Sequence, residues 1–238
     1  MTADPLQTHA SVRFFDAQFQ RQLQGAELQL NPFEQAALPW LAGRVLDYGC
    51  GLGNLAVAAA RRGCTVVALD GSPTAIAHLR AVARAESLPI EAGEADLRAH
   101  RPEGTFDAVV AIGLLMFFDC ATALRQLGAL QSHLRPGGVA AVNVLVEGTT
   151  YLDMFEPGEY CLFARDELAR RFAGWEIVHD EFAEFAAPNG QVKAFETLIA
   201  RKPRCRRAAP MTESCPGPRC GRQVQRWARV GSRPSATA

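Results

Sequence analysis

The segment VLDYGCGLGN, residues 45–54, combines a carboxylate with glycines at alternate positions. Asp47 ends an apolar run, and Gly49, Gly51 and Gly53 follow it. A glycine loop between a strand and a helix lets backbone N–H groups approach a bound ligand closely. The segment therefore predicts a small-ligand site at the end of a strand, with one negative charge beside the loop.

Two ligands are compatible with this loop. Residues 51–56 match the dinucleotide fingerprint G-x-G-x-x-G/A, and residues 47–53 match D-x-G-x-G-x-G, a loop that binds S-adenosylmethionine. Asp47 would repel the pyrophosphate of a dinucleotide. S-adenosylmethionine brings an ammonium and a sulfonium and no phosphate, so the charge of Asp47 favours it as the cofactor.

The elements that must position this loop alternate along the chain. Strands are predicted at residues 44–48, 65–70, 90–96, 106–112, 139–146, 175–185 and 192–200. Helical segments follow the first, second and fourth strands, which predicts parallel pairing of the first five strands, whereas Asn189-Gly190 between the last two predicts an antiparallel hairpin. We therefore expect an α/β fold with a doubly wound, mostly parallel seven-stranded sheet and a C-terminal antiparallel β-hairpin.

Three regions are predicted. Residues 1–43 form a helical segment, because Val12, Phe15, Phe19 and Leu23 recur at helical spacing and Asn31 can cap a second helix. Residues 44–200 form the cofactor-binding domain. Residues 201–238 form a tail rich in Arg, Pro and Cys, which is predicted to be disordered.

Charge and composition bound the possible partners and location. Residues 1–200 carry 15 basic and 24 acidic side chains, whereas residues 201–238 carry 10 and 1. The chain has no long apolar run and no visible signal peptide, so a cytoplasmic location without a membrane partner is expected. The cysteines at 50, 64, 120 and 161 are then expected to be reduced. No metal-ligand spacing occurs between residues 1 and 200, so no metal is predicted.

Residues 45–202 resemble the class I S-adenosylmethionine-dependent methyltransferases, and they are most similar to the tellurite-resistance (TehB-type) family. The resemblance lies in LDYGCGLGN, RGCTVVALDGSPTAIAHL, LLMFF, LRPGG and FARDELARRFAGWEI. It implies a Rossmann-like methyltransferase fold, S-adenosylmethionine as the cofactor, and a methyl-transfer activity.

The cofactor contacts are predicted from their positions after the strands. Asp70 ends the second strand, where a carboxylate can accept hydrogen bonds from both ribose hydroxyls. Asp96 ends the third strand, near the expected adenine, and Leu97 follows it, while Ile112 and Gly113 close the fourth. The full set is Asp47, Gly49, Cys50, Gly51, Gly53, Asp70, Gly71, Ser72, Asp96, Leu97, Ile112 and Gly113.

The methyl acceptor is expected to be a small molecule. After the fourth strand the chain lacks the Asn/Asp-Pro-Pro-Tyr/Phe loop of enzymes that methylate nucleobase amines, and nucleic acid is not an expected partner. No general base stands out and no catalytic residue is assigned. A soft nucleophile such as a thiol, selenium or tellurium compound needs little base catalysis. Met116, Tyr151 and Phe155 are predicted to line its pocket, the last two on a covering loop at residues 147–162.

Other functions remain open at this point. The cations that the family carries in its final hairpin are reduced here to Lys193, which weighs against a tellurite-like oxyanion. One alternative is an O- or N-methyltransferase of a specialised metabolite. A non-enzyme alternative is a metalloid- or nucleic-acid-binding protein that retains the fold and uses Cys205, Cys215, Cys220 or the arginines of the tail.

Overall fold

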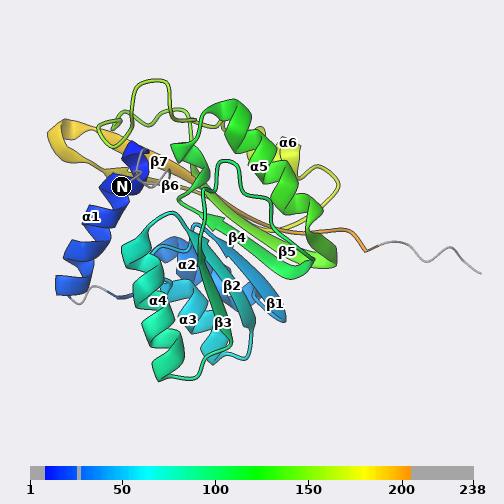
Figure 1. Cartoon of the computed structure of the whole chain (residues 1–238). Helices are drawn as coiled ribbons and strands as arrows, with labels where there is room; N and C mark the ends of the chain where they lie inside the picture. The colour runs from blue at the N-terminus through cyan, green and yellow to red at the C-terminus, as the bar shows by residue number, and fades with distance from the viewer. Residues whose placement is uncertain (1–8, 26–27, 205–238) are drawn as a thin grey trace, which may run out of the picture. The chain divides into compact units, whose positions relative to one another are not determined.

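The computed structural model describes residues 9–25 and 28–204. Seven strands form one sheet, and helices cover both of its faces (Figure 1). The strands are β1 (Arg44–Tyr48), β2 (Thr65–Asp70), β3 (Ile90–Glu94), β4 (Phe106–Ile112), β5 (Leu134–Leu145), β6 (Glu176–Ala186) and β7 (Val192–Arg201). The α-helices are α1 (Ala10–Gly25), α2 (Pro32–Ala37), α3 (Asn54–Arg61), α4 (Pro73–Ala85), α5 (Cys120–Ser132) and α6 (Glu167–Arg171), and the short 3-10 helices are η2 (Leu38–Trp40), η3 (Leu115–Phe117) and η4 (Pro188–Gly190).

The strand order is β3-β2-β1-β4-β5-β7-β6. The first five strands pair in parallel, β7 pairs antiparallel with β5, and β6 pairs antiparallel with β7. Asn189 and Gly190 adopt φ of 59° and 73° in the connection between β6 and β7. Both left-handed residues suit a hairpin turn, and the fold expected from the sequence is confirmed.

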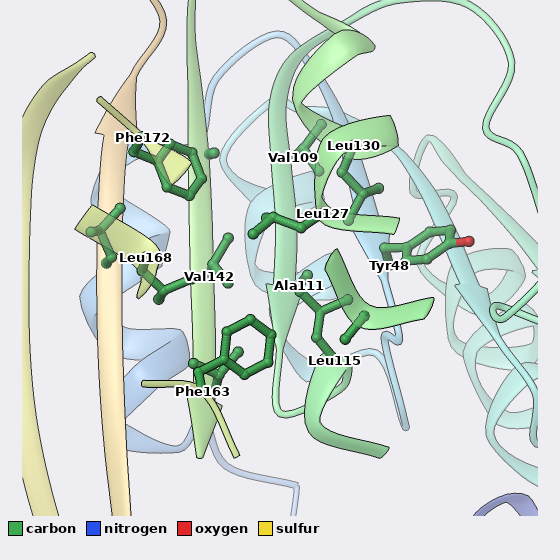
Figure 2. Packing of buried hydrophobic residues seen from close by; sticks show 14 of the residues in the cluster. Tyr48, Val109, Ala111, Leu115, Leu127, Leu130, Val142, Phe163, Leu168 and Phe172 are labelled. Atoms are coloured by element: carbon green, nitrogen blue, oxygen red, sulfur yellow. The ribbon is translucent and has the colours of Figure 1, made fainter. Parts of the chain in front are cut away.

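The core lies in two layers, one on each face of the sheet. Helices α3 and α4 bury Leu55 and Ile76 against one face. On the other face, Leu127 and Leu130 of α5 pack over Val109 of β4, as Figure 2 shows. Burial of these apolar side chains holds the carboxyl ends of the parallel strands at one edge of the sheet, where ligands bind in such folds.

The boundary between α5 and β5 differs from the prediction. The sequence analysis begins a strand at residue 139, but β5 begins at Leu134, which pairs with Phe106. The segment Arg135-Pro136-Gly137-Gly138 is therefore extended strand. Pairing with the chain after β7 explains this, because the Gly137 N–H donates to the Lys202 carbonyl at 2.9 Å. Tertiary pairing here outweighs the local preference of proline and glycine for turns.

The expectation that the four cysteines are all reduced is wrong. Cys50 and Cys64 are free and buried, but Cys120 and Cys161 form a disulfide across 41 residues of sequence. The bond joins the start of α5 to the end of the loop at residues 147–162. Only the tertiary fold brings these two cysteines together. The cytoplasmic location expected from the sequence stays a prediction.

The division of the chain into three regions stays a prediction, although the structure describes parts of the regions outside the central domain. Helix α1 contains the helically spaced residues from Val12 to Leu23, as predicted, and Asn31 caps α2 in a capping box with Glu34. The boundaries at 43/44 and 200/201 stay predictions, and residues 205–238 of the predicted tail lie outside the described residues. None of the described helices is long and apolar enough to cross a membrane.

Candidate functional site

A cavity of about 320 Å³ lies at the carboxyl ends of β1, β2 and β4. Strand β1 sits between β2 and β4, so the chain leaves β1 at the point where the strand order reverses. Crevices at such points are the usual ligand sites of doubly wound sheets. The predicted cofactor residues that line the cavity are Asp47, Gly49, Cys50, Gly51, Asp70, Gly71, Asp96, Leu97, Ile112 and Gly113.

Two predicted residues, Gly53 and Ser72, do not line the cavity and instead begin the helices behind it. Gly53 is the N-cap of α3 with φ of 78°, and a β-carbon there would lie 2.5 Å from Leu79. Ser72 caps α4, because its hydroxyl accepts a hydrogen bond from Ala75 N–H at 3.1 Å. Both residues shape the cavity through the helices that they start.

The glycine loop is held by backbone hydrogen bonds at its base. The N–H groups of Gly49 and Cys50 donate to the Leu69 carbonyl at 2.8 and 3.0 Å. Gly51 has φ of 51°, and a β-carbon there would lie 3.1 Å from the ring of Phe19. Glycine is required at such a left-handed and crowded position. The loop therefore presents bare backbone to the cavity.

Asp47 places a buried carboxylate with an unused oxygen at the cavity. Its side chain is 4% exposed, and Oδ2 has no hydrogen-bond partner among the described residues. Burial, followed by the negative charges of Glu34 and Asp70, raises the pKa of Asp47 to about 8. A buried unpaired carboxylate is costly unless it meets a donor or a cation. The site is therefore built to receive positive charge at this position.

Asp70 links the glycine loop to α4. Its Oδ2 accepts from Gly51 N–H and its Oδ1 from Ser72 N–H, each at 2.9 Å. Burial raises the pKa of Asp70, although the hydrogen bonds from Ser72, Gly51 and Gly71 oppose that rise. Each carboxylate oxygen has a second lone pair. The side chain is thus fixed in place and can still accept hydrogen bonds from a ligand.

The loop after β3 forms the next part of the wall. Asp96 Oδ1 accepts from Arg98 N–H at 3.0 Å. The Leu97 carbonyl accepts from the Tyr48 hydroxyl at 3.0 Å and from Gln126 Nε2 at 2.8 Å. These buried hydrogen bonds tie the loop to β1 and α5, so Asp96 and Leu97 meet the cavity in a fixed conformation.

Helix α1 covers the cavity, which the sequence analysis did not predict. Its lining residues are Ser11, Val12, Phe15, Gln18, Phe19 and Gln22. Asp16 accepts a hydrogen bond from the Ser72 hydroxyl at 2.5 Å and one from Thr74 N–H at 3.1 Å, at the start of α4. Arg98 Nη2 donates to Ser11 Oγ at 3.0 Å. The apolar spacing in α1 indicated an amphipathic helix but not the surface against which its apolar face lies.

Glu34 is a further cavity residue that was missed. The sequence identified it only as a capping residue, and its carboxylate does accept from Asn31 N–H at 2.8 Å. Burial raises the pKa of Glu34, and its charge contributes to the raised pKa of Asp47. A fourth acidic side chain, besides Asp47, Asp70 and Asp96, therefore adds to the negative potential of the cavity.

The three predicted acceptor residues lie outside the cavity lining, and their role stays a prediction. Met116 is buried in η3, and its carbonyl accepts from Cys161 N–H at 3.0 Å. The Phe155 ring lies 4.9 Å from that of Phe117, which does line the cavity. The Tyr151 ring lies 4.6 Å from Lys193 Nζ. The loop at residues 147–162 thus contacts the cavity through Phe117.

No cluster of three or more potential metal ligands occurs within residues 9–25 and 28–204. The cavity instead combines glycine backbone, two acidic side chains at strand ends, and an apolar cover. Together with the strand order, this arrangement is that of the class I S-adenosylmethionine-dependent methyltransferase fold.

Comparisons with known proteins agree with that class. Residues 45–138 match the family described as a methyltransferase domain. Hemagglutinin 1 of Eikenella corrodens is 30% identical over 67% of this chain and 55% of its own length. A probable S-adenosyl-L-methionine-dependent methyltransferase TehB of Haemophilus influenzae strain 10810 is 26% identical over 67% of this chain and 57% of its own length. The chain thus spans little more than half of either relative.

A solved structure gives the same fold. The crystal structure of TehB from Haemophilus influenzae superposes with a TM-score of 0.62 at 22% identity, covering 73% of this chain and 62% of that one. Residues 45–138 thus form a methyltransferase domain, and the chain is similar to S-adenosylmethionine-dependent methyltransferases of the TehB type, whose cofactor is S-adenosylmethionine.

Proposed function

We propose that the protein transfers the methyl group of S-adenosylmethionine to a small molecule with a soft nucleophilic atom. The observation that carries this proposal is Asp47, a buried carboxylate with an unused oxygen directly before a glycine loop. A cofactor with a positively charged methionyl group satisfies that oxygen, whereas a pyrophosphate would be repelled.

The residues present fit this cofactor. Asp47 accepts from the ammonium, directly or through water, and Glu34 adds negative charge on the same side. Asp70 is held by two backbone hydrogen bonds with its remaining lone pairs available for the ribose hydroxyls. Asp96 and Leu97 border the adenine, while Ile112 and Gly113 form the floor. When bound, the cofactor supplies an electrophilic methyl on a sulfonium whose thioether leaves readily.

The surroundings of the cavity favour a soft acceptor. No histidine lines the cavity within the described part of the chain, and its acidic residues are assigned to the cofactor. A thiolate, selenite or tellurite needs little or no base catalysis, so holding it in line with the methyl group can supply much of the barrier reduction. Arg98 places one cation in the lining, with Nη2 donating to Ser11 and to the Phe117 carbonyl. That cation can attract an anionic acceptor.

A labelled-methyl screen tests the proposal. The full chain is incubated with methyl-labelled S-adenosylmethionine and thiols, selenite, tellurite, phenols or simple amines. We expect label in a chalcogen compound, and we expect Asp47→Asn to reduce it. Glu86→Gln serves as the matched control, because Glu86 is an exposed partner of Arg61 at the C-terminal end of α4, the end opposite to Ser72.

Each outcome of the screen is decisive. Label on a phenol or amine alone would contradict the soft nucleophile and favour the O- or N-methyltransferase alternative. Failure of the full chain to bind S-adenosylhomocysteine in calorimetry would overturn the proposed activity altogether.

A further inference from the structure

A second cavity, also of about 320 Å³, opens at the opposite edge of the sheet. It lies at the amino ends of β4 and β5 and the carboxyl end of β7. Asp107 and Ile112 mark the two ends of β4, so the two cavities are about 17 Å apart at the rise per residue of a strand. The lining residues used below are Trp40, Asp107, Arg135, Gly137, Arg201 and Arg204.

Three arginines and one carboxylate line this cavity. Asp107 Oδ1 accepts from Arg135 Nη1 at 2.8 Å, and its Oδ2 accepts from Arg44 N–H at 2.8 Å. Both oxygens of the only acidic residue in the described lining are therefore engaged. Asp107 orients the guanidinium of Arg135 and does not neutralise the other two arginines.

Arg201 and Arg204 retain most of their hydrogen-bonding capacity. Arg201 donates from Nη1 to the Gly137 carbonyl at a long 3.4 Å, and its Nε lies 3.4 Å from the exposed carboxylate of Glu176. Arg204 lies against Gly137, where a β-carbon would be 3.2 Å from its Nε. A guanidinium carries five N–H donors, so most of these donors remain available to an anion. Three like charges around one hollow are held most favourably with an anion between them.

Trp40 adds an aromatic surface to the same cavity. It ends η2 and is partly buried against the core on the α3 side of the sheet. Arginine forks match the oxygens of a phosphate, and an indole face stacks with a flat ring of any base type. A ligand with both a phosphate and a planar base satisfies both features.

We propose that this cavity binds a nucleotide, with its phosphate between Arg135, Arg201 and Arg204 and its base on Trp40. The nucleotide is either free or part of a single-stranded RNA, since both present the same phosphate and base. The site is separate from the methyl-transfer cavity and does not depend on the function proposed for that cavity.

Calorimetry on the full chain tests this site, with uridine monophosphate, inorganic phosphate and a uridine decamer as probes. Saturating S-adenosylhomocysteine keeps these probes out of the cofactor cavity. The double variant Arg201→Gln/Arg204→Gln should weaken uridine monophosphate binding about tenfold or more, because charge-assisted hydrogen bonds are lost. Arg61→Gln/Arg170→Gln removes the same charge from exposed helix positions and should leave binding unchanged.

A second variant tests the contribution of the base to binding separately from that of the phosphate. Trp40→Phe should weaken uridine monophosphate while leaving inorganic phosphate unaffected, because only the nucleotide stacks. If the decamer binds more tightly than uridine monophosphate, and Arg201→Gln/Arg204→Gln abolishes that difference, the natural ligand is RNA. If the two probes bind equally tightly, the natural ligand is a free nucleotide. Binding of any probe that the double variant does not weaken, or no binding of uridine monophosphate at low salt, overturns the proposal.

Discussion

Binding of the cofactor should release a proton from Asp47. Burial and the charges of Glu34 and Asp70 raise its pKa to about 8, so about nine in ten of these carboxyls are protonated at pH 7. A cofactor ammonium favours the charged carboxylate and lowers the pKa. About 0.9 proton should therefore leave per cofactor bound at pH 7, falling to about 0.5 at pH 8.

Calorimetry with S-adenosylhomocysteine measures this release directly. Titrations in phosphate and in Tris differ in buffer ionisation enthalpy, and the difference in observed heat gives the number of protons released. Affinity should rise with pH toward 8, by at most about tenfold per unit. In Asp47→Asn the heat should become independent of the buffer, and affinity should fall by about tenfold or more because a charge-assisted contact is lost.

The same variant has an opposite effect on stability. The folded pKa of Asp47 is about 8 and the ordinary value is 3.8, so the free protein loses stability as pH rises between these values. Asp47→Asn should raise the melting temperature of the free protein at pH 8 and change it little at pH 4. Equal heats in the two buffers for the wild type at pH 7, or a melting temperature that Asp47→Asn lowers at pH 8, would refute the reasoning about this residue.

Three further predictions concern other side chains. Asp70→Ala should weaken cofactor binding by about 1–3 kcal/mol, because the polar groups of the ribose and of the Gly51 N–H lose their acceptor; unchanged calorimetric affinity would place the ribose elsewhere. Phe155→Ala should alter the KM or kcat for the acceptor and spare cofactor affinity, since its ring lies outside the cavity lining and contacts the lining residue Phe117; normal turnover of every acceptor would contradict this. Burial raises the pKa of Glu196 to about 7, with Asp180 and Asp166 adding to the rise, so its charge destabilises the fold above pH 7. Glu196→Gln should therefore raise the melting temperature at pH 8 more than at pH 5, and a pH-independent difference would refute it.

Local sequence signals predicted the parts of the structure that depend on neighbouring residues. The left-handed conformations of Gly51 and Gly53 follow from a motif in which the backbone must turn tightly, and Asn189-Gly190 predicted the hairpin. The apolar face of α1 also followed from the spacing of neighbouring residues. The docking of α1 over the cavity depends instead on contacts between distant residues, such as Asp16 and Ser72, which are 56 positions apart.

Contacts between distant segments could not be read from the sequence. The Cys120–Cys161 bond joins residues 41 positions apart, and periodicity carries no information on which cysteines meet. The second cavity is formed by residues of η2, β4, β5 and the end of β7, so no short stretch of the sequence contains all of its lining residues. The extended LRPGG segment was missed because its hydrogen bonds go to the chain after β7.

The aromatic contacts around Phe117 have a consequence for the kinetic order of the reaction. Its ring lies 4.8 Å from that of Phe15 on α1 and 4.9 Å from that of Phe155 on the loop at residues 147–162. Movement of α1 away from the cavity removes one neighbour of Phe117 and loosens the contact with the other. We therefore expect exchange of the spent cofactor and entry of the acceptor to be coupled, because both covering segments contact Phe117.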